Sequence, residues 1–106
     1  MESIIGIKIP QDSPLAKVAA IIRPLKKMAI SEIGRRIKNN EYLLFCDCID
    51  DEGLAVVIHC YDELMKIGIT PVVYEHGRLS SIEFLNNLMH TYKEIAEDID
   101  SDPIEY

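Results

Sequence analysis

Three cysteines and one histidine in the middle of the chain are the residues best suited to metal or nucleophilic chemistry: Cys46, Cys48, His59 and Cys60. Thiolate and imidazole are ligands that zinc prefers, and a thiolate beside an imidazole can attack an acyl group. However, this spacing is not usual for zinc, and adjacent residues of a helix point about 100° apart. No glycine-rich loop that could form an oxyanion hole accompanies them. We therefore expect buried free thiols, with no metal, no cofactor and no enzymatic activity.

The remaining histidines and the glycines form no catalytic or nucleotide-binding pattern. His76 precedes Gly77 in a sequence typical of a turn, and His90 lies beside an apolar helical stripe. The five glycines are scattered along the chain, so the sequence contains no glycine-rich phosphate loop. A binding function is therefore the better expectation.

Charge is distributed unevenly along the 106 residues. The net charge of −7 comes from 18 acidic and 11 basic residues. Residues 1–40 hold eight basic and three acidic side chains, whereas residues 41–106 hold three basic and fifteen acidic ones. The two portions therefore carry +5 and −12. This balance disfavours attraction of the whole chain to nucleic acid or to anionic membranes, and favours a basic partner.

Six carboxylates form the candidate partner-binding site, around the end of one expected strand and along the following helix: Asp47, Asp50, Asp51, Glu52, Asp62 and Glu63. A nuclease must attract phosphate, so an inhibitor that presents carboxylates gains steering and specificity from that requirement. The chain has the general character of the immunity proteins of bacterial toxin systems, which are small cytoplasmic domains with such surfaces. We therefore expect an acidic binding protein that blocks a basic toxin, with a nuclease as the first choice.

Two alternatives remain open. The basic segment 23–38 could contact phosphates in a ribosome- or RNA-associated module, although it lacks aromatic residues for stacking and the rest of the chain is acidic. Its cations are Arg23, Lys26, Lys27, Arg35, Arg36 and Lys38. Alternatively, the basic and acidic groups are solvated surfaces that pair with each other across the fold.

The apolar spacing predicts a single mixed α/β (α+β) domain that holds these side chains. We expect strands over residues 1–9, 41–49 and 69–75, helices over 15–22, 32–38 and between 50 and 68, and a long helix over 80–99. Pro24 should end or kink the first helix, and Ser31, Asp50 and Ser80 should cap the later ones at their start. Gly68 should form a left-handed cap at the end of the third helix. Residues 1–77 would form the core, and residues 78–106 a helix and acidic tail packed on it.

The expected order is strand, two helices, strand, helix, strand, and then the long helix. Three strands with helices on one face leave the other face bare, yet the strand at 41–49 is apolar on both sides. We expect the final helix to cover that face, with a partner protein as the alternative.

The sequence KVAAIIRPLKKMAISEIGRRIKNN, followed by LAVVIHCYDELMKIG and ITPVVYE, resembles the C-terminal domain of the bacterial ribosomal stalk protein. That domain has the same order up to the third strand, and its first helix also opens with a Lys-Val-Ala run, here Lys17-Val18-Ala19. The resemblance covers roughly residues 4–76. The stretch that contacts translation factors in that family is replaced here by residues 25–31. The resemblance therefore implies a fold and no functional residues.

The sequence also indicates the cellular compartment in which the protein is expected. No apolar run approaches the roughly 18 residues of a membrane span, and residues 1–10 show no signal-peptide pattern. An odd number of cysteines argues against a disulfide framework. We expect a cytoplasmic protein with free thiols.

Overall fold

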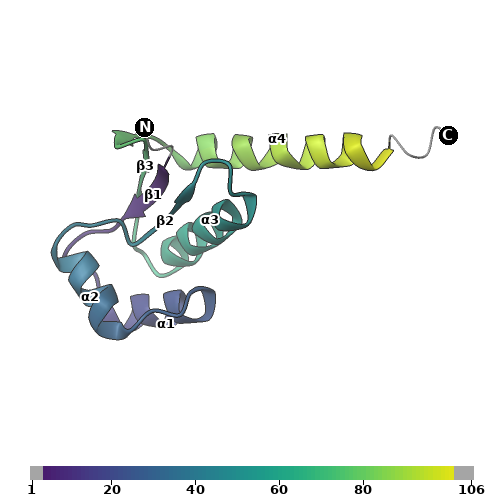
Figure 1. Cartoon of the computed structure of the whole chain (residues 1–106). Helices are drawn as coiled ribbons and strands as arrows, with labels where there is room; N and C mark the ends of the chain where they lie inside the picture. Colours follow the sequence, from purple (N-terminus) through teal and green to yellow (C-terminus); the bar gives the residue numbers. More distant parts are fainter. Residues whose placement is uncertain (1–3, 102–106) are drawn as a thin grey trace.

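The computed structural model describes residues 4–101, with side chains up to residue 91, and shows a mixed α+β fold (Figure 1). The class is the one expected from the sequence. In chain order the elements are β1 (Ile4–Lys8), α1 (Leu15–Leu25), α2 (Ile30–Lys38), β2 (Leu44–Asp47), α3 (Asp51–Lys66), β3 (Val72–Glu75), β4 (Arg78–Leu79) and α4 (Ile82–Ser101).

The sheet has four strands, not the three predicted. All neighbours are antiparallel, in the order β2-β1-β3-β4. The added strand, β4, forms a hairpin with β3 through His76 and Gly77, whose φ angles of 53° and 79° are both left-handed. Two positive φ angles are typical of the tight turns that join hairpin strands. The turn was expected, but β4 has only two residues, which are too few to show the alternating pattern that predicts a strand.

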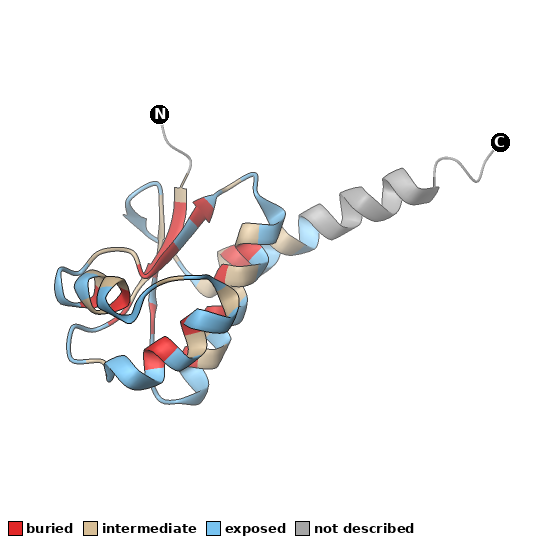
Figure 2. Ribbon diagram, turned by 60° about the horizontal axis from the view of Figure 1, so that its bottom comes forward, coloured by how far each residue is buried: buried red, intermediate tan, exposed pale blue. Residues whose placement is uncertain are grey.

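The core lies on one face of this sheet. Ile5 and Ile7 of β1 are fully buried there, and the register places Cys46 and Leu44 of β2 beside them. α3 packs against β1 and β2, while α1 packs against α3 and α2. Figure 2 shows the buried residues concentrated where these elements meet. The helical part of the core consists of Val18, Ala19, Ile22, Ile33, Ile37, Leu54, Val57, Cys60, Leu64 and Leu85.

The first two helices differ at their ends from the prediction. α1 continues through Pro24 to Leu25, and the Lys26 N–H still donates to the Ile22 carbonyl at 2.8 Å. Proline removes its own N–H as a donor and crowds the carbonyl four residues earlier, but neither effect reaches the hydrogen bond from Lys26 to Ile22, so the helix continues to Leu25. α2 begins at Ile30 with Ala29 as its N-cap residue and no side-chain cap, so the prediction for Ser31 was wrong.

The caps of the two later helices were predicted with mixed success. Asp50 caps α3 as expected, accepting a hydrogen bond from the Gly53 N–H at 3.0 Å. Gly68 follows α3 with a left-handed φ of 86°, also as expected. At α4, the hydroxyl of Ser81 accepts from the Phe84 N–H at 3.4 Å, one residue later than the predicted cap at Ser80.

The final helix does not cover the second face of the sheet. α4 packs against α3, where Leu85 is fully buried, and then runs past the body of the fold (Figure 1). On the uncovered face, Phe45 of β2 is 45% exposed and Val72 of β3 is 38% exposed. The side chains expected to continue the α4 stripe, from Tyr92 to Ile99, lie outside the described residues, as does the end of the acidic tail at 102–106. Among the described residues, none of the helices is long and apolar enough to cross a membrane.

Candidate functional site

Four of the six predicted carboxylates lie together where β2 turns into α3. We call them the acidic junction: Asp47, Asp50, Asp51 and Glu52. All four are exposed, and between them Ile49 is 78% exposed. This apolar side chain has carboxylates on both sides of it in the chain, so an apolar group and several negative charges are presented together.

Hydrogen bonds hold the turn of the acidic junction and the carboxylates of Asp47 and Asp50. The Asp50 N–H donates to the Asp47 carbonyl at 3.0 Å, and the Ile49 N–H donates to the Asp47 carboxylate at 3.3 Å. Asp50 then accepts from Gly53 as the cap of α3. A Cβ on Gly53 would lie 2.5 Å from the Asp50 carboxylate and 2.7 Å from the Cβ of Cys46, so this close approach requires glycine. The carboxylates therefore occupy a defined turn, with two of them in the first turn of α3.

The other two predicted site residues are elsewhere. Asp62 and Glu63 lie in the third turn of α3 beyond Glu52, about 15 Å along the helix axis. Asp62 is exposed, whereas Glu63 forms an ion pair with Lys66 at 2.7 Å. The hydrogen bond from Lys66 lowers the pKa of Glu63, and the same contact raises the pKa of Lys66. The structure thus divides the predicted site into a group of four and a group of two.

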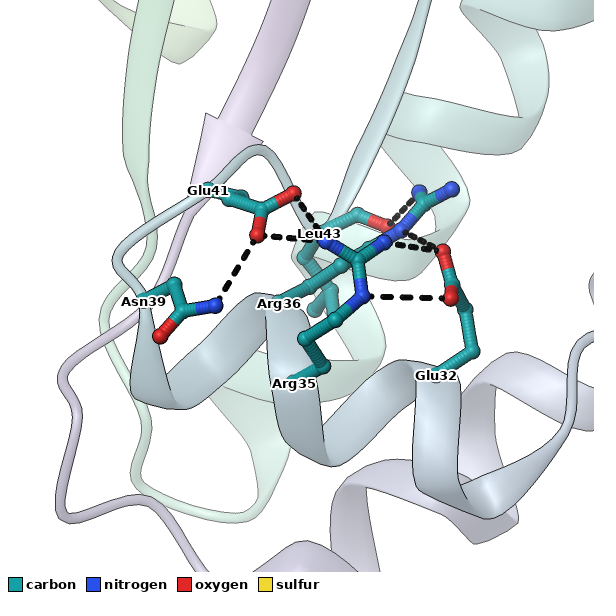
Figure 3. Close-up of polar contacts among 6 residues, drawn as sticks. All are labelled: Glu32, Arg35, Arg36, Asn39, Glu41 and Leu43. Carbon is teal, nitrogen blue, oxygen red and sulfur yellow. Dashed lines mark hydrogen bonds and ion pairs between the residues drawn. The ribbon is translucent and has the colours of Figure 1, made fainter.

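Two cations of the basic segment pair locally rather than across the fold (Figure 3). Arg35 bridges Glu32 and Glu41, with nitrogen to oxygen distances of 2.7 Å to each. Arg36 pairs with Glu32 at 2.9 Å and donates to the Leu43 carbonyl at 3.2 Å. Hydrogen bonds from Arg35 and then Arg36 lower the pKa of Glu32. Within residues 4–91, no ion pair joins the basic segment to any of the six predicted carboxylates.

The three cysteines form no disulfide, and Cys46 and Cys60 are poorly suited to chemistry. Burial raises the pKa of Cys60 to about 12, and burial together with Asp50 and Asp47 raises the pKa of Cys46 to about 11. Both thiols are therefore protonated near neutral pH, whereas the reactive form of cysteine is the thiolate. In the part of the chain that the structure describes, no three metal-ligating side chains gather at one place.

A cluster of aromatic rings on the uncovered sheet face was missed by sequence reasoning. We call it the aromatic face: Tyr42, Phe45 and Tyr74. The Tyr42 ring centroid lies 6.4 Å from that of Phe45 and 5.9 Å from that of Tyr74. These residues come from β2, β3 and the loop before β2, so only the register brings them together. The one sequence signal is the apolar character of both sides of residues 42–49, which predicts a cover on this face and does not predict a cluster of rings there.

Comparison with known proteins does not place the chain in a family. No family of known proteins matches it, and neither a curated protein nor a solved structure does.

Proposed function

We propose that this chain is a small acidic binding protein that neutralises a basic partner protein, acting in the cytoplasm as an immunity protein against a nuclease toxin. The observation that carries the proposal is the acidic junction. None of its four carboxylates forms an ion pair within the described residues, and Ile49 stands open among them.

The arrangement has the physical features of a protein-binding surface. An exposed apolar side chain that becomes buried on binding supplies affinity, while surrounding charges steer the approach and select the partner. The carboxylates of Asp47 and Asp50 accept backbone hydrogen bonds, so they lose less conformational freedom on binding, which lowers the entropic cost. A nuclease active site is cationic because it binds phosphate, so it offers the complementary charge.

The proposal accounts for the acidic excess better than internal pairing does. Arg35 and Arg36 are already paired with Glu32 and Glu41, near their own helix. The carboxylates of the acidic junction therefore keep their charge available for another molecule. The same local pairing also weakens the alternative of an RNA-associated module built on segment 23–38, because two of its six cations are already engaged.

The test is co-expression with the product of the neighbouring gene, followed by measurement of affinity and its salt dependence. The triple variant Asp47→Asn, Asp51→Asn, Glu52→Gln removes three charges and keeps the shape of each side chain. We expect weaker binding to the basic partner, mainly through a slower association rate, and a flatter salt dependence.

A matched control removes one charge from the same helix outside the acidic junction. Asp62→Asn should leave the association rate within about twofold of the wild type, because charges farther apart than a Debye length of about 8 Å are largely screened at physiological salt. Unchanged affinity in the triple variant would disprove the assignment of the acidic junction.

A further inference from the structure

A row of paired residues crosses all four strands on the uncovered face of the sheet. The register pairs Gly6 of β1 with Phe45 of β2 on one side and with Tyr74 of β3 on the other. Tyr74 in turn pairs with Leu79 of β4. Residues paired directly across antiparallel strands point to the same face, so we call these four residues the cross-strand row. Phe45 is 45% exposed and Leu79 is 74% exposed, which leaves both ends of the row open to solvent.

Aromatic rings and a lysine already cover the middle of the row. A Cβ on Gly6 would lie 2.7 Å from a ring carbon of Tyr42, so the Tyr42 ring rests on the backbone of β1. The Nζ of Lys8 lies 5.2 Å from the ring centroid of Tyr42 and 4.8 Å from that of Tyr74. The surface left for another molecule therefore consists of the apolar ends of the row and of Val72, which pairs with Lys8 and is 38% exposed.

Opposite charges lie at equal distances on either side of the row. Lys8 follows Gly6 by two residues on β1, whereas Asp47 of β2 pairs with Ile4, two residues before Gly6. The backbone positions of both charged residues therefore lie about 7 Å from the row along the strands, one on either side. Among the described residues, neither Lys8 nor Asp47 forms an ion pair. The face thus has a cationic side and an anionic side, with apolar groups between them.

We propose that this face binds a second copy of the chain, in a dimer whose twofold axis runs along the cross-strand row. Rotation by half a turn about that axis stacks the two sheets face to face, about 10 Å apart, with their strands aligned. Each residue of the row then lies opposite the same residue of the second copy, so Phe45 packs on Phe45 and Leu79 packs on Leu79. The contact is isologous, as in most homodimers.

The charges select both the occupant and its orientation. The rotation places the Lys8 side of each sheet over the Asp47 side of the other. These two residues lie on neighbouring strands about 4.8 Å apart, an offset that the four-carbon stem of lysine can span. A twofold axis parallel to the strands would instead place the cationic side over the cationic side. A second copy therefore supplies, at the required positions, a partner for each of the two charges.

A hollow on the cationic side adds to the contact. It has a volume of about 420 Å³, and its lining consists of Lys8, Arg36, Asn40, Glu41, Tyr42 and Phe45. These residues lie near the beginning of β2, whereas Asp47 ends that strand. Because the rotation reverses β2, the Asp47 end of one strand lies over the hollow at the beginning of the other.

The size of the face predicts a weak dimer. Four strands spaced about 4.8 Å apart and about 15 Å long present on the order of 300 Å² of sheet in each copy. A stable complex buries about 800 Å² per partner, whereas transient encounters bury less. We therefore expect monomer and dimer in exchange, with a dissociation constant in the micromolar range or above. Asp47 also belongs to the acidic junction, so self-association should compete with binding of the basic partner.

The experiment is sedimentation equilibrium of the purified full chain alone, from about 10 µM to about 1 mM, the range that suits a weak interface. The average mass should rise toward that of a dimer as the concentration increases. Leu79→Lys should weaken self-association by at least about tenfold, because each substitution acts twice in a twofold dimer. Met65→Lys is the matched control, since Met65 is 45% exposed on α3, which packs on the opposite face of the sheet, and it should leave self-association unchanged.

An exchange of charges tests the orientation. Lys8→Glu and Asp47→Lys, each alone, place like charges opposite each other. Each should weaken self-association by about twofold to thirtyfold, the loss expected for two exposed ion pairs. The double variant again has opposite charges in contact, so it should associate more tightly than either single variant.

Three outcomes would overturn the proposal. They are a monomer at every concentration, wild-type self-association in Leu79→Lys, and a double charge variant that associates no better than the single variants. Leu79 is largely exposed, so Leu79→Lys should fold normally, which far-UV circular dichroism checks. Only the chain itself is present in these measurements, so a failure here leaves the proposed function of the acidic junction untouched.

Discussion

Asp50 has two roles in the structure, and they can be separated. Its carboxylate accepts the Gly53 N–H at 3.0 Å as the cap of α3, and it also contributes charge to the acidic junction. Replacing a capping aspartate with alanine costs about 1 kcal/mol, within a range of about 0.5–2 kcal/mol. For a domain of this size, with a urea m-value of about 1–3 kcal/mol per M, Asp50→Ala should lower the midpoint of urea unfolding by about 0.3–1 M.

Asp50→Asn should behave differently. Asparagine caps helices about as well as aspartate, so the hydrogen bond to Gly53 is retained. The lost charge costs about 0.3–1 kcal/mol at the positive end of α3, but its removal also relieves repulsion from the neighbouring carboxylates by a similar amount. We therefore expect a change in the free energy of unfolding within about 0.5 kcal/mol. Affinity for the basic partner should nevertheless fall in both variants, because both lack the charge.

The measurement is urea unfolding at 25 °C, followed by far-UV circular dichroism, for the wild type and the two variants. Asp51→Asn serves as a control, since Asp51 is exposed in the first turn and does not cap α3. The reasoning would be refuted if Asp50→Ala left the midpoint unchanged, or if Asp50→Asn destabilised the protein as much as Asp50→Ala does.

Three further predictions concern other parts of the fold. Gly6→Ala should lower the free energy of unfolding by about 1–2 kcal/mol. Overpacking of the new methyl group against the Tyr42 ring costs about 1–3 kcal/mol, which outweighs the gain of about 0.4–1 kcal/mol from a stiffer unfolded chain. A midpoint temperature of thermal unfolding equal to or above that of the wild type would contradict this prediction. Because burial raises the pKa of Cys46 to about 11 and that of Cys60 to about 12, the folded chain holds these protons more tightly than the unfolded one, so stability is retained below about pH 9 and lost above it. By pH 10 the loss should be about 1.4 kcal/mol for each thiol, and a double variant with alanine at both positions should show a correspondingly smaller loss in urea unfolding between pH 8 and pH 10. Ser81→Ala should cost about 1 kcal/mol through the lost cap of α4, measured as a lower urea midpoint, and an unchanged midpoint would show that the 3.4 Å contact contributes little.

Local sequence signals predicted most of the elements because the interactions that form them are local. The cap at Asp50 and the left-handed turn at Gly68 each depend on a few neighbouring residues, and both were found as expected. The errors in helix caps occurred where neighbouring residues could form the same cap with similar energies. Ser80 and Ser81 are both competent caps, and only the hairpin that precedes them determines which one meets the first turn of α4.

The candidate site was predicted in part for the same reason. Asp47 and Asp50–Glu52 are so close in the chain that any turn between β2 and α3 keeps them together. Asp62 and Glu63 are separated from the acidic junction because α3 is one continuous helix, which places them about 15 Å farther along its axis than Glu52. The ion pairs of Arg35 and Arg36 with Glu32 follow from helical spacing. The ion pair of Arg35 with Glu41 and the hydrogen bond from Arg36 to the Leu43 carbonyl depend instead on where α2 ends and how the chain returns to β2, so charge counting alone does not reveal them.

The sequence by itself determined the mixed α+β class, most helices and strands, and the placement of four carboxylates in one turn, because each follows from spacing within a short stretch of chain. Only the tertiary structure decided which face of the sheet stays open and what lies on it. That outcome depends on strand register, which pairs Gly6 with Phe45 and Tyr74 across distant parts of the chain. It also depends on α4 packing against α3, a choice between two apolar surfaces that no local pattern distinguishes.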